Sequence, residues 1–421
     1  MEKNHLGIIL FCIMSLMTGA VSAQTWTVYK TNNSGIPGNS VWDLAVDSTN
    51  TLWVATSDGL GKYDGSNWTT YNFSNTPIPP NSLDDFYTVF VDWDQNVWVG
   101  TENGYLYKFD QDTTWTDYSA GSFGDVYAIR QDYTGKMWIG HHFGLKSLDD
   151  TTWTDHTGSL PDNYVTSIEV DTDNHIWVGT KNGVGLFDND STWVEYTPLN
   201  SGITPNNPWI ESIRLGFGDD MWIGSRDGIY LFDKDTTWVK YNSSNTPLWD
   251  DQVRSVDIDS DSIVWIANDA ASMGKYKGGS WSNIFFPSFP NGITFSRVVL
   301  VDLLGAKWIG AQDGLARYNS LGAGPIYLNE KEIDLGANSI IGYPNPATQY
   351  INFEFQMSSD ETVQIYVQNI QGQFIEHVFE GKINEDNFTT KYYVESLPAG
   401  IYFAVIQSSK QISYFKFIVT E

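Results

Sequence analysis

Nine side chains in this sequence have the chemistry of a ligand site, although they lie far apart along the chain. They are Trp42, Tyr87, Tyr127, His141, His142, Trp209, Glu211, Arg254 and Arg297. Aromatic rings and guanidinium groups suit an anionic or polyhydroxylated ligand, which they bind by stacking and hydrogen bonding. The adjacent histidines could bind a metal or transfer a proton, but no third metal ligand accompanies them at a usual spacing. We therefore predict a ligand site and assign no catalytic or metal-binding residue.

Charged residues inside predicted strands have two possible roles. Six of them fall close to the expected centre of the fold: Arg130, Glu169, Glu211, Arg214, Arg254 and Arg297. A charge in such a place is costly unless it is paired or hydrated. They either form ion pairs that line a hydrated channel or recognise the ligand. We favour the ion pairs, because structural pairs resemble functional charge clusters.

Common catalytic motifs are absent from the sequence. It contains no HExxH, no nucleophile elbow and no phosphate-binding glycine loop. This argues against the common hydrolases. It leaves open a lyase or glycosidase, whose carboxylates or tyrosines need no local motif.

The elements that position these residues belong to a repeat of about forty residues. A Trp followed by Val or Ile and then Gly or Ala recurs at Trp53, Trp98, Trp138, Trp177, Trp222, Trp265 and Trp308. This period, with short strands and Asp/Gly turns between copies, is typical of propeller blades. Each unit predicts four antiparallel strands, but the last unit stops after its third.

The N-terminus supplies the strand that the last unit lacks. Residues 25–29 read Thr-Trp-Thr-Val-Tyr, the form that the fourth strands of the other units take. We predict an all-β protein with a seven-bladed β-propeller over residues 24–319, closed by this N-terminal strand. An open solenoid is the alternative, but it gives the N-terminal strand no partner.

Most tryptophans and aspartates of the repeat have structural explanations. Tryptophans at repeated positions are expected to pack within and between blades, which leaves Trp42, Trp93, Trp209 and Trp249 outside the pattern. Aspartates six residues before the first Trp of a unit suit turns that bind backbone N–H groups. Runs such as Asp92–Asn96 resemble part of a calcium loop without its Gly and Glu, so weak calcium binding stays an alternative and no cofactor is predicted.

The first residues and the charge predict an exported protein. A charged start, an apolar run over residues 6–14 and Val21-Ser22-Ala23 are typical of a signal peptide at residues 1–23. The one cysteine, Cys12, lies in that segment, so we expect no disulfide in the mature chain. The net charge of −28 disfavours nucleic acid as a partner. No later apolar run suits membrane insertion.

The units share the motif Asp-x-x-x-x-x-Trp-Ile/Val-Gly-Thr, in which x is any residue. An Asp-Gly or Asn-Gly pair follows it. Over residues 41–318 these units resemble the repeats of the two-component regulator propeller family. In that family such propellers often form the sensor half of membrane-bound hybrid histidine kinases. This chain departs from that arrangement, with no kinase, response-regulator or transmembrane segment. The resemblance implies the fold and gives weaker support to ligand sensing.

After a Gly-rich linker at residues 320–337, the pattern changes to alternating strands typical of a small β-sandwich over residues 338–421. Its motifs are carried by Tyr343, Pro344, Asn345, Pro346, Gly372, Leu397, Pro398, Gly400 and Tyr402. They resemble the type A sorting domain of the type IX secretion system, found in Bacteroidetes-type bacteria. The resemblance implies that the chain interacts with this machinery and is secreted or attached to the outer cell surface. An ordinary partner-binding sandwich is the alternative.

Three functions are compatible with these features. The first is an exported propeller that binds a glycan or protein without turnover. The second is a carbohydrate-active propeller enzyme, a lyase or glycosidase. The third is a surface protein whose propeller only displays loops.

Overall fold

The computed structural model describes most of the chain after residue 24. The described residues are 25–79, 85–119, 123–188, 192–205, 207–216, 219–259, 261–286, 292–319, 341–345, 347–356, 361–369, 374–383, 387–395, 397, 400–408 and 412–419. The predicted signal peptide and linker lie outside these ranges, as do Pro346, Gly372 and Pro398 of the sorting motif. Within these ranges no helix has the length and apolarity needed to cross a membrane.

The described residues between 25 and 319 form seven four-stranded antiparallel sheets. The first sheet contains β2 (Val41–Val46), β3 (Leu52–Thr56), β4 (Gly59–Tyr63) and β5 (Trp68–Tyr71), and the second contains β6 (Phe86–Val91), β7 (Val97–Thr101), β8 (Leu106–Phe109) and β9 (Trp115–Asp117). The third contains β10 (Val126–Gln131), β11 (Met137–His141), β12 (Gly144–Asp149) and β13 (Thr152–Asp155), and the fourth contains β14 (Val165–Val170), β15 (Ile176–Thr180), β16 (Gly183–Phe187) and β17 (Trp193–Tyr196). The other three are β18 (Ile210–Leu215), β19 (Met221–Ser225), β20 (Gly228–Phe232) and β21 (Trp238–Tyr241); β22 (Val253–Ile258), β23 (Val264–Asn268), β24 (Ser272–Lys277) and β25 (Ser280–Phe285); and β26 (Ser296–Val301), β27 (Lys307–Ala311), β28 (Gly314–Asn319) and β1 (Thr25–Tyr29). Two 3-10 helices, η1 (Glu102–Gly104) and η2 (Thr157–Ser159), lie in the connections.

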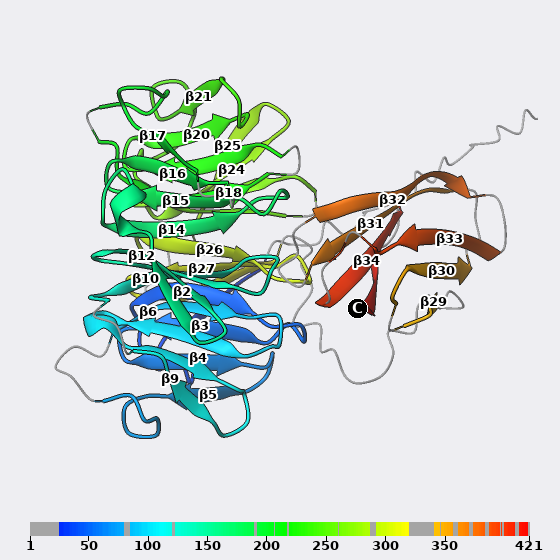
Figure 1. Ribbon diagram of the computed structural model, residues 1–421, viewed down its shortest axis with the longest axis horizontal. Helices are drawn as coiled ribbons and strands as arrows, with labels where there is room; N and C mark the ends of the chain where they lie inside the picture. Colours follow the sequence, from blue (N-terminus) through cyan, green and yellow to red (C-terminus); the bar gives the residue numbers. More distant parts are fainter. Residues whose placement is uncertain are drawn as a thin grey trace, which may run out of the picture.

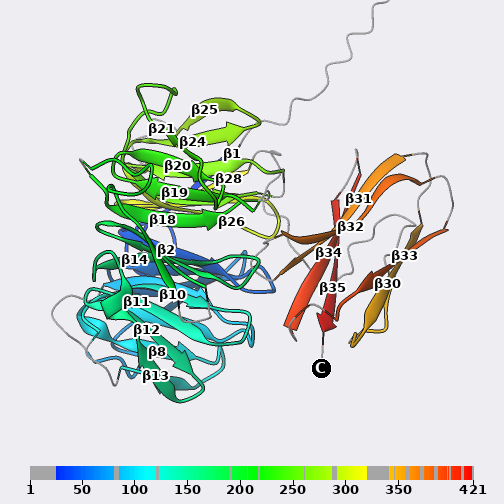
Figure 2. The same ribbon diagram turned by 45° about the horizontal axis from the view of Figure 1, so that its top comes forward.

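The N-terminal strand closes the ring, as predicted. Strand β1 pairs antiparallel with β28, and Trp26 lies opposite Tyr318. The first strands of neighbouring sheets contact one another around the axis, including β2 and β26 at the junction between the two ends. Figures 1 and 2 show these sheets, coloured from blue through yellow, as one body.

The repeated tryptophans form the core. The second strand of every sheet is buried over its full length, and these tryptophans are nearly inaccessible to solvent. In six sheets the indole N–H donates to the aspartate six residues before it, at 2.7 to 3.5 Å. The other carboxylate oxygen accepts backbone N–H groups of the turn, as in Asp259, which binds Asp261 and Ile263 at 3.0 Å. The predicted turn role of these aspartates is confirmed.

Aromatic contacts join each sheet to the next. Trp53 packs against Phe109 of the following sheet, and Trp177 packs against Phe232 in the same way. Trp308 of the last sheet stacks on Tyr29 of β1 and contacts Tyr63 of the first. The predicted packing role of the repeated tryptophans, within and between sheets, is confirmed.

The C-terminal strands form two sheets around their own core. One contains β29 (Ile341–Tyr343), β30 (Tyr350–Gln356) and β33 (Asn387–Tyr393), and the other β32 (Phe374–Ile383), β31 (Glu361–Asn369), β34 (Gly400–Ser408) and β35 (Ile412–Val419). Phe353 and Tyr392 of the first sheet pack with Val367 and Phe417 of the second. The sequence predicts strands over residues 350–356, 362–368, 391–395, 401–407 and 412–420, which correspond to β30, β31, β33, β34 and β35, but it missed β32 and the short β29. In β32, Gly381 and polar residues interrupt the apolar alternation.

The propeller has two ends, which position the candidate sites. We call the opening where each first strand begins the entry mouth, and the opening where it ends the exit mouth. Antiparallel pairing places the connections before each first strand at the entry mouth. It places the turns that carry the buried aspartates at the exit mouth.

Candidate functional site

Every first strand of the propeller contains a bulge at the entry mouth. The first residue of each strand pairs with the second strand, the next residue has no partner, and pairing resumes at the third. The first residues are buried, whereas the bulged residues are partly exposed. A bulge redirects a side chain in this way. The seven bulged residues are Trp42, Tyr87, Tyr127, Thr166, Glu211, Arg254 and Arg297.

Six of the nine predicted site residues therefore occupy one equivalent position in six sheets. They surround the entry mouth, although forty or more residues separate neighbours in the sequence. The sequence analysis identified their residue types. It missed the bulge, which is the feature that they share.

The first half of this ring is aromatic. The ring of Trp42 meets that of Tyr87 at 5.0 Å, Tyr87 stacks on Tyr127 at 5.5 Å, and Tyr127 stacks on Tyr164 at 5.0 Å. Tyr164 then meets Trp209 at 5.6 Å. Tyr164 was missed because it precedes its strand and breaks no pattern in the sequence.

The second half is charged, and much of it is paired. Glu211 accepts from Arg226 Nε at 2.6 Å and lies 3.4 Å from Arg254 Nη1. Arg254 also lies 3.3 Å from Asp269. Glu211 and Arg254 thus fit the ion-pair role that the sequence favoured.

Arg297 is different from these paired residues. It donates to Ser40 Oγ at 2.7 Å, and its guanidinium lies 3.9 Å from the centre of the Trp42 ring. Among the described residues it has no carboxylate within 4 Å. Burial and the nearby charge of Arg254 lower the pKa of Arg297.

The aromatic half supplies hydrogen-bond donors. The indole N–H groups of Trp42 and Trp209 are buried and have no hydrogen-bond partner among the described residues. Burial raises the pKa of Tyr87, and the carboxylates of Glu102 and Asp85 raise it further. The Tyr87 phenol therefore stays protonated and can donate.

Trp209 and His142 lie at the edge of the mouth. Two cations cover the Trp209 ring, with Arg226 at 3.2 Å and Lys181 Nζ at 4.4 Å from its centre. His142 is 43% exposed, and its Nδ1 lies 3.8 Å from Asp125. Its ring also meets Tyr164 at 4.7 Å.

His141 does not reach the mouth, which corrects its assignment to the site. It is the last residue of β11 and is 1% exposed. Its Nδ1–H donates to the carbonyl of Phe123, and burial lowers its pKa to about 4. The residue opposite His141 in the neighbouring strand is Val126. Residues that lie opposite each other point to the same face of the sheet, and Val126 is buried, so the His141 side chain also points into the core.

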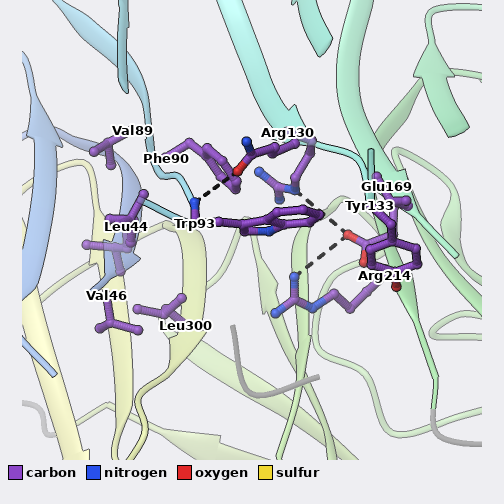
Figure 3. Close-up of a pocket in the computed structure, with 14 residues that line it drawn as sticks. Leu44, Val46, Val89, Phe90, Trp93, Arg130, Tyr133, Glu169, Arg214 and Leu300 are labelled. Carbon is purple, nitrogen blue, oxygen red and sulfur yellow. Dashed lines mark hydrogen bonds and ion pairs between the residues drawn. The ribbon is translucent and has the colours of Figure 1, made fainter. Parts of the chain in front are cut away.

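A pocket occupies the other end of the channel, where the sequence analysis assigned no site. It is lined by the fifth residues of several first strands and by Trp93 and Tyr133 from the turns. Figure 3 shows the Trp93 side chain extending across it toward Tyr133 and Glu169. The fifth residues in order around the ring are Ala45, Phe90, Arg130, Glu169, Arg214, Asp257 and Leu300.

The charged part of this ring forms a continuous network. Arg214 Nη2 lies 2.6 Å from Asp257, and its Nη1 lies 3.7 Å from Glu169. Glu169 also faces Arg130 Nε at 3.9 Å. Burial raises the pKa of Glu169, against the effect of the two arginines.

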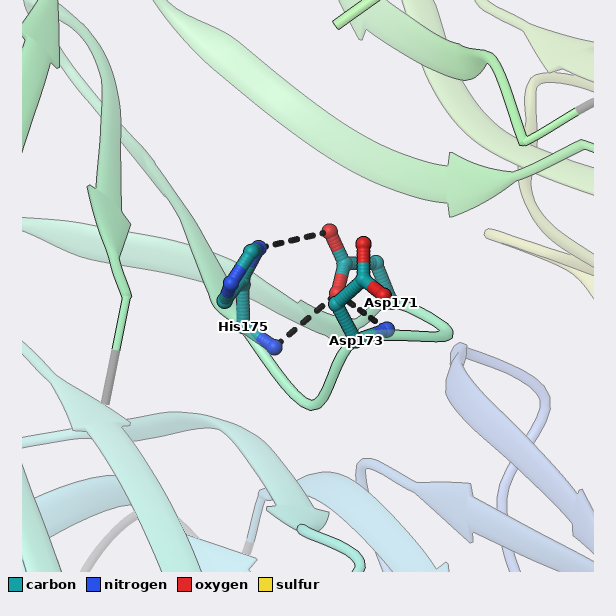
Figure 4. A group of neighbouring side chains, drawn as sticks. All are labelled: Asp171, Asp173 and His175. Atoms are coloured by element: carbon teal, nitrogen blue, oxygen red, sulfur yellow. Dashed lines mark hydrogen bonds and ion pairs between the residues drawn. The ribbon is translucent and has the colours of Figure 1, made fainter. Parts of the chain in front are cut away.

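One group of side chains has the arrangement of a possible metal site. Asp171, Asp173 and His175 offer ligand atoms within 4.8 Å of one another, in the turn after β14 (Figure 4). However, Asp171 already accepts from the Trp177 indole at 2.9 Å and lies 2.9 Å from Lys234 Nζ. The ammonium group of Lys234 holds the place that a cation would take, so this group does not favour a metal.

Comparisons with known proteins identify two parts of the chain. Residues 342–420 match the family model described as secretion system C-terminal sorting domain. Residues 35–58 and 159–182 match that described as two component regulator propeller. No curated protein matches the sequence.

Solved structures share the fold at low sequence identity. A structure titled streptogramin B lyase has a TM-score of 0.59 and 15% identity, covering 70% of this chain and 97% of its own. The extracellular domain of the putative hybrid two component system BT3049 from B. thetaiotaomicron has a TM-score of 0.58 and 16% identity, covering 94% and 58%. PorZ, described as an essential surface component of the type-IX secretion system of Porphyromonas gingivalis, has a TM-score of 0.58 and 16% identity, covering 93% and 60%.

This chain thus spans less than two thirds of the length of the latter two proteins. Identities of 15 to 16% show a common fold and nothing finer. The conclusion about the location of the protein rests on the match to the sorting domain. The chain is a β-propeller protein with two-component regulator propeller repeats at residues 35–58 and 159–182 and a type IX secretion sorting domain at residues 342–420, and it is secreted or held at the outer cell surface.

Proposed function

We propose that the propeller is an exported binding module whose entry mouth binds a glycan. The observation that carries the proposal is the set of seven bulged residues, one from each sheet, around one opening. A bulge leaves its residue outside the sheet pairing, and bulges are enriched next to functional sites. Five of the seven equivalent bulges present an aromatic or cationic side chain, which favours recognition over packing.

The exposed chemistry suits a ligand rich in oxygen atoms. Tyr87, Tyr127 and Tyr164 stack on one another, so part of each ring face is covered by its neighbour. What remains for a ligand is ring edges and hydroxyl groups. Such donors bind the hydroxyl and ring oxygens of sugars.

Arg297 favours a glycan that carries acidic groups. Its guanidinium has no carboxylate partner among the described residues and lies beside Trp42, next to the aromatic half. A guanidinium in this setting can hold a carboxylate or sulfate through two parallel hydrogen bonds. Arg254 is less available, because Glu211 and Asp269 already pair with it.

The test is a glycan array with the full chain, followed by titration of the glycans that bind. Arg297→Gln should weaken binding of an acidic glycan at least tenfold, and Tyr87→Phe should weaken it several-fold by removing one hydroxyl. Trp249→Ala is the control at the same end of the propeller, because this tryptophan is 66% exposed, contacts Phe285 and is not one of the seven bulged residues. Absence of binding to any glycan would contradict the proposal and favour a protein that only displays loops.

A second candidate, a carbohydrate-active enzyme, is favoured by one carboxyl group. Burial and the carboxylates of Asp125 and Asp85 raise the pKa of Glu102, which suits a general acid. Tyr127 donates to Asp125 at 2.8 Å in the same region. Product analysis of each bound glycan separates the two functions: new reducing ends or unsaturated products that disappear in Glu102→Gln indicate catalysis, and intact glycan indicates binding alone.

A further inference from the structure

The pocket at the exit mouth has two unlike halves. Leu300, Ala45 and Phe90, from three successive sheets, make one half apolar. Arg130, Glu169 and Arg214, from the next three sheets, make the other half charged. The pocket has a volume of about 80 Å³ and opens to solvent.

Within the charged half, Arg214 and Glu169 are occupied by each other and by Asp257. Arg214 Nη2 lies 2.6 Å from Asp257, and Glu169 is only 1% exposed between two arginines. A ligand cation would find no open carboxylate here, because Glu169 and Asp257 already pair with the two arginines. The charged half therefore disfavours an amine.

Arg130 has guanidinium N–H donors that its neighbours do not use. Its Nη1 donates to the carbonyl of Ile129 at 2.9 Å, and its Nε lies 3.9 Å from Glu169, longer than a hydrogen bond. A guanidinium has five N–H donors, and this side chain is 32% exposed. The remaining donors have no further partner among the described residues that line the pocket.

Trp93 forms one wall of the pocket, and it is not one of the tryptophans at repeated positions. It stands in the turn after β6, where its backbone N–H donates to Gln131 Oε1 at 2.9 Å, and its ring stacks with Tyr133 at 6.4 Å. Figure 3 shows the indole between Arg130 and Arg214 in this view, with Phe90 and Leu300 farther along the pocket. A large ring held beside a donor with spare capacity is expected for an amphipathic ligand.

We propose that the exit pocket is a second binding site, which takes a small organic acid with an apolar body. The carboxylate pairs with the guanidinium of Arg130 through two parallel hydrogen bonds. The apolar body lies against Phe90, Leu300 and Trp93. This site is separate from the entry mouth and does not depend on glycan binding there.

The experiment is isothermal titration of the full chain with phenylacetate, indole-3-acetate and 4-methylpentanoate. At least one acid should bind in a 1:1 ratio, and acetate should bind at least tenfold more weakly because it lacks the apolar body. For phenylacetate, the matched probes 2-phenylethanol and phenethylamine keep the ring and replace the acid. Both should also bind at least tenfold more weakly than the acid.

Variants locate the site. Arg130→Gln should weaken binding of the acid at least tenfold. Trp93→Ala, which changes a residue in the turn after β6, should weaken it several-fold. Arg130→Lys keeps the charge without the planar fork and should give an intermediate loss, which guards against a simple folding defect in Arg130→Gln. Arg297→Gln at the entry mouth should leave acid binding unchanged.

Three results with the acids, the amine and the pocket variants would overturn the proposal. They are no binding of any acid, tighter binding of phenethylamine than of phenylacetate, and acid binding that survives both Arg130→Gln and Trp93→Ala. A loss of acid binding in Arg297→Gln would place the acid at the entry mouth and also overturn it. Glycan binding is measured separately, so each site can fail alone.

Discussion

Each buried aspartate of the repeat joins a turn to the core. Asp92 accepts from the Trp98 indole at 2.8 Å with one oxygen and from the backbone N–H of Asn96 at 2.7 Å with the other. One side chain thus satisfies a buried indole and closes the turn after a first strand. The fifth sheet has Gly216 at this position, so the contact strengthens the fold without being needed in every sheet.

Replacing this aspartate should cost stability. Asp92→Ala leaves the buried Trp98 indole N–H unsatisfied, at roughly 1–3 kcal/mol, and the partly buried Asn96 N–H at a smaller cost, so we expect a loss of about 2–4 kcal/mol. The measurement is the urea unfolding midpoint. Asp94→Ala, at an exposed position two residues along the same turn, is the control and should change the midpoint little. Equal midpoints for the two variants would contradict this account.

The buried His141 should make stability depend on pH. Its pKa is lowered to about 4 by burial, so the unfolded chain takes up this proton first as the pH falls. Its contribution is constant above about pH 6.5 and is lost toward pH 4, at up to about 1.4 kcal/mol per pH unit. His141→Asn keeps an N–H for the Phe123 carbonyl and cannot titrate. Unfolding midpoints should fall less steeply with acid in this variant than in the natural chain, and parallel curves would exclude the effect.

At the scale of elements, the closing strand and the bulges have the largest consequences. Strand β1 covers β28, which would otherwise be an open sheet edge, and brings the two ends of the propeller together. Trp26 fixes this strand, with its ring 4.8 Å from Tyr318 and 5.5 Å from Phe286. The fold is therefore closed by a contact between the first and last residues of the propeller.

Weakening that contact should open the ring. Trp26→Ala should lower the unfolding free energy by about 2–3 kcal/mol, somewhat less than for a fully buried Trp. Deletion of residues 25–29 should also expose the edge of β28 and cause association, which light scattering detects. Thr27→Ala, on the exposed side of the same strand, should do neither. A monomeric deletion variant of unchanged stability would show that β1 is dispensable.

At the scale of the whole molecule, the propeller and the C-terminal sheets have separate hydrophobic cores. The C-terminal core contains Ile351, Phe353 and Phe417 and shares no residue with the propeller clusters. Figure 1 shows the C-terminal strands, orange to red, as a second body. The sorting domain and the proposed binding sites therefore lie in different parts of the molecule.

Removing residues 338–421 should abolish export without unfolding the propeller. The physical reason is that the propeller keeps its core and its closing strand. Cell fractionation should find the truncated chain inside the outer membrane, and its unfolding midpoint should match the propeller transition of the full chain. Unchanged delivery to the surface would contradict the sorting role.

The sequence by itself determined the repeat, the closing strand and the sorting domain. These features rest on local patterns: a fixed spacing of Trp, Asp and Gly, the Thr-Trp-x-x-Tyr form of residues 25–29, and short motifs near the C-terminus. Residue type also identified six members of the entry mouth. The sequence did not show that they share a bulge, because pairing register depends on two strands at once.

Only the tertiary structure decided which side chains meet. Tyr164 joins the aromatic half through contacts with residues of neighbouring sheets, and Trp93 lines a pocket at the opposite end. His141 is buried although its neighbour His142 is half-exposed, since β11 ends at His141 and His142 already lies in the following turn. The ring brings together residues about forty positions apart in sequence. Its two channel ends therefore exist only after closure.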